Sequence, residues 1–392
     1  MGNTEKTNAY DAITLCNNSN DVKSSGGRNY SLDLLRIISM IMIIFLHINS
    51  HGGLIEYWSL DSLNGILLRF IHVCCMVSVN VYVLITGYFL VYQKFRFSRI
   101  FKIVLETVAY TWIIGIVLII NGDSLSIGEY LGLLLPVSYS SYWFVTAYIG
   151  LSLLSPFLNK LLVSLNKSQH LLLVILLLLM HSLLRDILVS SEPFATSKGY
   201  SLVWFITLYV VGAFIRKYVN LDSVKHPFAI YLGICLLMFA LWALLSVLST
   251  RFSFIEKYSL CSYWTRYNSI LNVLASVFLF TTFARKNIQT KSFCKGISII
   301  APLTFGVYLI HDNAYVRDYL WLECFKVNTF ENNALLIPKS LLVVVAIFAG
   351  CITIDFIRKT FFDVLFYKRK YFSDLMRKLD DLPYRIMERF SE

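Results

Sequence analysis

Charged side chains are scarce in this chain of 392 residues. They make up 15% of it, whereas an ordinary soluble domain has about 25%. Hydrophobic residues make up 57%, and the mean hydropathy is +0.64. This composition excludes a soluble globular domain and predicts an all-α, polytopic membrane protein.

Cysteine patterns are lacking as well. The eight cysteines form no CxxC pair, and most of them lie in apolar runs, which favours small packing residues over disulfides or metal ligands. A signal peptide is not expected, because the first apolar run is too long and too charged at its start. Residues 1–27 are rich in Asn, Ser, Thr and Gly, and we expect them to form a disordered cytoplasmic N-terminus.

Apolar runs of about 17 to 25 residues predict ten membrane-spanning helices. They lie at about 31–50, 66–92, 100–120, 142–162, 169–185, 201–216, 228–249, 267–284, 297–316 and 336–357. The segment 66–92 is longer than a span requires, so we expect it to be tilted or broken. We find no internal repeat that would favour an inverted-repeat transporter.

Lys and Arg are distributed unevenly between the two sides that these spans define. Loops on the side of the two termini carry 25 of them, and the opposite loops carry 8. Because positive residues accumulate in cytoplasmic loops, both termini are predicted to be cytoplasmic. This distribution explains the net charge of +11 without nucleic acid as a partner. Residues 361–392 form a basic amphipathic tail that we expect to lie along the anionic inner leaflet of the bilayer.

Arg36 and His47 interrupt the apolar run LDLLRIISMIMIIFLHI. In a helix, eleven steps of about 100° place the two side chains within about 20° of each other and about 16 Å apart along the axis. A charge in a membrane helix costs at least about 2.5 to 3.5 kcal/mol, so Arg36 requires a partner or a water-filled cavity. Glu106 and Asp33 are the alternative partners. Because histidine exchanges protons near neutral pH, we predict that His47 and Arg36 are catalytic.

Further polar and aromatic residues are predicted at the membrane depth of His47. They are Arg69, His72, His311, Asp312, Trp143 and Tyr142. One interpretation is a substrate-binding site, with the aromatic rings stacked on sugars. The alternative is an interfacial belt with side chains that snorkel or bond between helices. His47 and His51 have a spacing that suits zinc, but no third ligand is evident, so no metal site is expected.

A basic loop follows the second span and contains Lys94, Arg96, Arg99 and Lys102. Guanidinium groups bind phosphate well, so the loop is a candidate site for a phosphorylated ligand. Ordinary positive-inside bias is the alternative explanation.

These motifs resemble those of the acyltransferase family 3 membrane proteins. Arg36, ten residues and then His47 resemble the family's Arg-X10-His signature, and Arg96-Phe-Ser-Arg99 is similar to its cytoplasmic RxxR motif. Segments 142–159, 201–218 and 303–313 resemble the bacterial surface-polysaccharide O-acetyltransferase branch. The resemblance implies a membrane domain at about 28–360 that lacks the extracytoplasmic esterase-like domain of some members.

The function implied by the resemblance is transfer of an acyl group, usually acetyl, from acyl-CoA to a hydroxyl of a cell-surface or lipid-linked saccharide. The enzyme would be an O-acetyltransferase of the bacterial cytoplasmic membrane, with acetyl-CoA as a substrate and no permanently bound cofactor. His47 would be the general base, Arg36 would position the donor, and the basic loop would bind the CoA phosphates. An acetyl-histidine intermediate is the competing mechanism. An exporter or flippase of a lipid-linked saccharide or small polar substrate is the alternative function.

Overall fold

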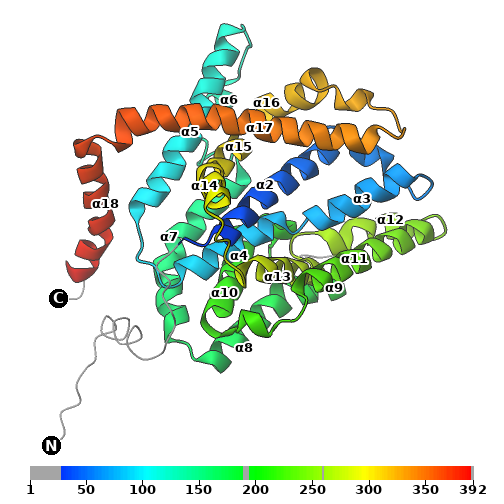
Figure 1. The fold of residues 1–392 in the computed structure, drawn as a ribbon, viewed down its shortest axis with the longest axis horizontal. Coiled ribbons are helices and arrows are strands. Elements are labelled where there is room, and N and C mark those ends of the chain that lie inside the picture. Colours follow the sequence, from blue (N-terminus) through cyan, green and yellow to red (C-terminus); the bar gives the residue numbers. More distant parts are fainter. Residues whose placement is uncertain (1–27, 189–193, 258–259, 390–392) are drawn as a thin grey trace, which may run out of the picture.

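The computed structural model describes residues 28–188, 194–257 and 260–389. Within these ranges the chain is helical and contains no strand (Figure 1). The helices are α2 (Tyr30–Ser50), α3 (Leu63–Cys75), α4 (Ser78–Leu90), α5 (Phe97–Ile120), α6 (Ile127–Leu134), α7 (Trp143–Ser164), α8 (Lys167–Leu178), α9 (Leu184–Leu188), α10 (Leu202–Tyr218), α11 (Pro227–Ser249), α12 (Ser253–Lys257), α13 (Ile270–Ala284), α14 (Lys291–Ile300), α15 (Thr304–His311), α16 (Ala314–Asp318), α17 (Leu336–Phe362) and α18 (Lys370–Arg389). The N-terminal segment 1–27, expected to be disordered, lies outside the described residues.

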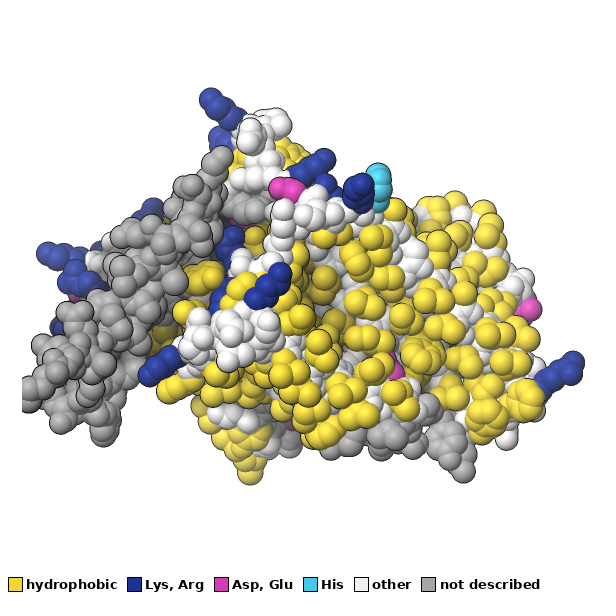
Figure 2. All heavy atoms as spheres, turned by 90° about the horizontal axis from the view of Figure 1, so that it is seen from below, with side chains coloured by type: hydrophobic (Ala, Val, Ile, Leu, Met, Phe, Trp, Pro, Cys, Tyr) yellow, Lys and Arg dark blue, Asp and Glu magenta, His cyan; other side chains and the backbone are white. Residues whose placement is uncertain are grey.

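Eight helices of the described ranges are long and apolar enough to cross a membrane, whereas the sequence predicts ten spans. The predicted spans at 169–185 and 201–216 are the helices Lys167–Leu183 and Leu202–Tyr218. Both are at the short limit for a span, so the count of ten stays a prediction. Figure 2 shows a face covered largely by hydrophobic side chains, with Lys and Arg mainly at its margins, as contact with lipid requires.

Two predicted spans are interrupted. The break expected in 66–92 lies at Met76 and Val77, between α3 and α4. The predicted span 297–316 is instead divided into α14, a turn at Ala301–Leu303 and α15. Pro302 in this turn has no N–H to donate and therefore disfavours a continuous helix. Helix α15 follows this turn and ends at His311, which contacts His47.

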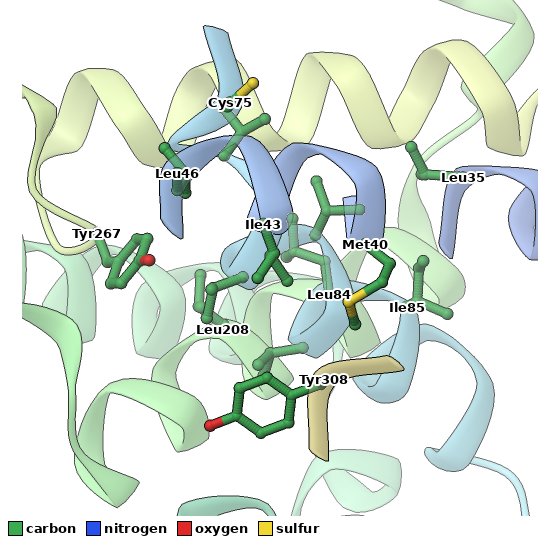
Figure 3. Packing of buried hydrophobic residues seen from close by; sticks show 14 of the residues in the cluster. Leu35, Met40, Ile43, Leu46, Cys75, Leu84, Ile85, Leu208, Tyr267 and Tyr308 are labelled. Carbon is green, nitrogen blue, oxygen red and sulfur yellow. The ribbon is translucent and has the colours of Figure 1, made fainter. Parts of the chain in front are cut away.

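Helix α2 lies inside the helix bundle, as Figure 1 shows. In its apolar stretch 67% of the residues are buried, compared with 22% in α5 and in α11. Figure 3 shows Met40 of α2, Leu84 of α4 and Leu208 of α10 among the buried side chains of this core. The start of α2 is defined by Asn29, whose side chain accepts the Leu32 N–H at 3.0 Å and so caps the helix.

Helices α4 and α10 pack closely because each has a glycine where they meet. A Cβ atom on Gly87 would lie 2.3 Å from the backbone oxygen of Tyr209. A Cβ atom on Gly212 would lie 2.5 Å from the backbone oxygen of Leu84. Small residues at such positions let the backbones of membrane helices approach each other.

Gly87→Val is therefore expected to destabilise the protein, because the added side chain forces α4 away from α10. Overpacking costs about 1 to 3 kcal/mol or more. A thiol-reactive dye that reports exposure of buried cysteines would show a lower melting temperature for the purified variant. Gly233→Val is the control, since no atom lies within 4 Å of a Cβ at that position of α11. Equal melting temperatures for the two variants would contradict the expectation.

Loops predicted on the same side of the membrane meet at the same end of the bundle. On the side predicted to be cytoplasmic, hydrogen bonds of 2.7, 3.1 and 2.8 Å join Asn159 to Leu90, Lys217 to Leu165 and Arg285 to Val224. On the opposite side, hydrogen bonds of 2.8, 2.8 and 2.9 Å join Asn64 to Asn332, Asn268 to Thr196 and Ile270 to Asp186. This grouping agrees with the predicted alternation of loops, and the side that faces the cytoplasm stays a prediction.

The C-terminal helix α18 packs against α5 at the edge of the bundle (Figure 1). Asp380 accepts hydrogen bonds from the backbone N–H of Ser98 at 2.7 Å and from its hydroxyl at 2.8 Å. A carboxylate suits this place, because the first N–H groups of α5 have no partner within the helix. The tail is thus held beside the basic loop, and its predicted contact with lipid stays a prediction.

Candidate active site

A cavity of about 970 Å³ lies between α2, α4, α7 and α15. One face of α2 forms part of its wall, from Arg36 through Met40 and Ile43 to His47. These residues recur every three or four positions, as one face of a helix requires. The two candidate catalytic residues therefore open onto one continuous space, about 16 Å apart along the helix axis.

At the Arg36 end, the partner of Arg36 is Asp33. Arg36 Nη1 lies 2.6 Å from Asp33 Oδ1, and Arg28 Nε lies 2.5 Å from the other oxygen of this carboxylate. The alternative partner, Glu106, also lines the cavity but pairs with Arg358 at 2.9 Å. A guanidinium has five N–H donors, so one contact with Asp33 leaves Arg36 donors for a ligand.

At the other end of the cavity, His47 contacts His311 of α15. His47 Nδ1 lies 2.9 Å from His311 Nε2. The side chain of His47 is 20% exposed, whereas His311 is fully buried. Asp312 lies next to the pair, with Oδ1 3.5 Å from His47 Nδ1 and 3.8 Å from His51 Nε2. Burial, together with the nearby Arg317, lowers the pKa of His51.

The hydrogen bonds around His311 determine which nitrogen of His47 is free. His311 Nδ1 lies 2.6 Å from the carbonyl oxygen of Val307, which can only accept, so this nitrogen carries the proton. In neutral His311, Nε2 is then an acceptor. It accepts a hydrogen bond from the Nδ1–H of His47, and the lone pair of His47 therefore resides on Nε2. The buried neighbour thus fixes the tautomer in which the cavity-lining histidine has a free basic nitrogen.

The basic loop lies beside the Arg36 end of the cavity. Lys94, Arg96 and Arg99 line a smaller hollow of about 60 Å³, and Ile103 and Tyr148 line both spaces. Lys102, predicted with them, lines neither space, and its ammonium lies 4.9 Å from the ring centroid of Tyr367. The structure therefore brings together three of the four predicted basic residues.

Four of the six residues predicted to bind substrate line the large cavity, namely Arg69, His72, Asp312 and Trp143. His311 and Tyr142 do not line it. Tyr142 is buried, and its hydroxyl donates to the carbonyl of Leu309 and accepts from Asn313, both at 2.7 Å. These two residues therefore support the wall, because their polar atoms are engaged by the protein.

Sequence reasoning missed three basic residues of the wall at the His47 end. They are Lys198, Arg266 and Arg317, all on loops that are predicted to be poor in positive charge. An exception to the positive-inside bias was the signal that could have indicated them.

The family model for the acyltransferase domain matches residues 29–356, which include both ends of the cavity. The chain belongs to acyltransferase family 3. No curated protein and no solved structure matches the chain. With its apolar helices, the acyltransferase is a membrane protein.

Proposed function

We propose that this acyltransferase moves an acetyl or other short acyl group from acyl-CoA to a hydroxyl of a cell-surface or lipid-linked saccharide. We place it in the bacterial cytoplasmic membrane. The observation that carries the proposal is the continuous cavity between Arg36 and His47. It offers an anion-binding group at one end and a basic nitrogen at the other, as a CoA thioester and a hydroxyl require.

The donor enters at the Arg36 end. Arg96 and Arg99 bind the phosphates of CoA, since guanidinium groups match phosphate oxygens well. The pantetheine arm passes Arg36 along the face of α2 and reaches the level of His47. The shared wall residues Ile103 and Tyr148 support this route, because they border both the hollow of the basic loop and the large cavity.

The acceptor occupies the His47 end. His47 Nε2 takes the proton of the acceptor hydroxyl as its oxygen attacks the thioester carbon. The tetrahedral intermediate then collapses and the C–S bond breaks. The CoA sulfur receives the proton that His47 took from the hydroxyl. The products are the O-acyl saccharide and CoA. In the competing mechanism, His47 Nε2 attacks the thioester itself and passes the acyl group to the hydroxyl.

A membrane assay tests the proposal. Membranes with the acyltransferase, supplied with acetyl-CoA labelled in the acetyl group, are expected to transfer the label to saccharide, whereas membranes without it are not. An exporter or flippase would move saccharide across the membrane without consuming the thioester. Saccharide transport without acetyl-CoA turnover would therefore overturn the proposal.

The double substitution of Arg96 and Arg99 by alanine is expected to raise the KM for acetyl-CoA. Loss of charge-assisted hydrogen bonds to phosphate predicts an increase of about 10- to 100-fold. High salt should raise the KM of the unmodified enzyme in the same direction, because exposed charges are screened. Lys102→Ala is the matched control, since this lysine lines neither cavity. An unchanged KM in the double variant would mean that the loop only sets topology.

A further inference from the structure

Arg69 of α3 is a buried cation that has no acidic partner among the residues the structure describes. It is 1% exposed, and its guanidinium carbon lies 4.3 Å from the ring centroid of Trp58 and 5.3 Å from that of Trp242. Its polar contact is with Thr265 Oγ1 at 3.4 Å, and its Nε has no partner among the described residues. In those same residues no carboxylate lies within 4 Å of it. Since arginine keeps its charge, the site holds an uncompensated positive charge.

This charge borders the part of the cavity where the acceptor binds in the proposed function. Arg69, Trp58 and His72 all line the wall. The His72 ring lies 4.5 Å from the Trp58 ring, and His72 Nδ1 has no hydrogen-bond partner in the described part of the chain. The cluster therefore presents two nitrogen groups that no described side chain satisfies.

Basic side chains outnumber acidic ones in the described wall at the His47 end. Basic residues of this end are Arg69, Lys198, Arg266 and Arg317, whereas Asp312 is the acidic residue that the described wall contributes there. The second acid of the wall, Glu106, lies at the Arg36 end and is paired with Arg358. Of these basic residues, Arg317 lies 3.7 Å from the carboxylate of Asp318. The attraction for an anion is therefore assigned to Arg69, whose charge lies in a wall of low polarity.

Aromatic rings complete this end of the cavity. The Trp143 ring lies 4.6 Å from the Tyr200 ring and 6.4 Å from the Tyr267 ring, between centroids. All three residues line the wall. Aromatic rings stack on the apolar faces of sugars. The His47 end of the cavity therefore combines a surface for a sugar ring with the positive charge of Arg69.

From this juxtaposition we propose that the acceptor is an anionic saccharide, and that Arg69 and His72 recognise its carboxylate or phosphate. The inference rests on the proposed function, because it names the class of acceptor for the same cavity. An anion beside Arg69 supplies a counter-charge that no described residue provides there. A neutral saccharide would leave the buried guanidinium unpaired.

The test compares two sugars that differ in one group. Purified full-length protein is titrated with methyl β-glucuronide and with methyl β-glucoside at constant ionic strength, and binding is followed by tryptophan fluorescence. The expected result is binding of the glucuronide at least about tenfold more tightly, the usual effect of a hydrogen bond to a charged group. Inorganic pyrophosphate is the third probe, because the anion could also belong to a lipid carrier of the saccharide.

Arg69→Gln is expected to remove the preference for the anionic probe without changing the affinity for methyl β-glucoside or acetyl-CoA. Arg69→Lys keeps the charge and should retain part of the preference. Arg251→Gln is the control, since Arg251 is exposed and does not line the cavity. If Arg69→Gln weakens the binding of methyl β-glucuronide, the anion belongs to the sugar. If Arg69→Gln weakens only the binding of pyrophosphate, the anion belongs to a lipid carrier.

Two outcomes would overturn the inference. One is that the unmodified protein prefers neither anionic probe over methyl β-glucoside, a result that needs no variant to fold. The other is that Arg69→Gln weakens the binding of both sugars equally, as a purely structural residue would. The assay measures binding without turnover, so failure of the proposed function would be detected separately, by absence of acetyl-CoA-dependent acylation.

Discussion

Replacing His47 with alanine is expected to slow acyl transfer by about 10²- to 10⁴-fold, the usual contribution of a positioned general base. The variant loses the imidazole ring that lines the cavity but little of the packing, because the His47 side chain is partly exposed. Transfer of labelled acetyl to saccharide in membranes would measure the rate, and the amount of folded protein would be checked by gel filtration in detergent.

His226→Asn is the matched control for His47→Ala. His226 is exposed, lies outside the cavity and has a positive φ of 49°, which asparagine tolerates well. This variant should keep the full rate. Activity of His47→Ala near that of the unmodified enzyme would refute the assignment of the base.

The variant His47→Ala also distinguishes direct acyl transfer from the mechanism with an acetyl-histidine intermediate. Labelled acetyl-CoA is mixed with enzyme in the absence of acceptor, and the reaction is stopped without acid. Direct transfer predicts that the protein carries no label. An acetyl-histidine intermediate predicts label on the protein that disappears in His47→Ala.

His311→Leu is expected to lower kcat by about 10- to 100-fold, comparable to the loss of second-layer partners that orient a histidine in other sites. The substitution removes the acceptor that lies 2.9 Å from His47 Nδ1, so the tautomer and ring orientation of His47 are no longer fixed. His311 does not line the cavity. The KM for acetyl-CoA should therefore stay unchanged.

His311→Gln separates positioning from packing. The amide oxygen of glutamine accepts a hydrogen bond from His47 Nδ1, so this variant should recover part of the lost kcat. If the Leu and Gln variants lose kcat equally, and in proportion to their loss of thermal stability, the role of His311 is structural and the proposed fixing of the tautomer is wrong.

Local patterns were enough to predict several features of the fold. The apolar runs predict helices because a membrane requires every backbone group to be satisfied within its own segment. The length of 66–92 predicts a tilted or broken helix, and the structure has a break between α3 and α4. The shared face of Arg36 and His47 follows from helix periodicity, and both residues line one cavity.

Other features of the site depend on contacts between distant segments, and the sequence left them open. Glu106 and Asp33 were the alternative partners for Arg36. The packing of α17 decided between them, because Arg358 of that helix pairs with Glu106 and Arg36 pairs with Asp33. Lys102 seemed equivalent to its neighbours in the basic loop, yet the rotation of α5 directs it toward Tyr367.

By itself, the sequence determined that this is an α-helical membrane protein with a cation and a histidine on one helix face, since hydrophobicity and helical period act locally. The tertiary structure alone decided which polar groups surround that histidine. His311 is 264 residues away from His47 in sequence, and the contact between the two rings arises only where α15 ends against α2. Such contacts depend on how the helices pack and rotate against one another, and no local pattern in either segment specifies them.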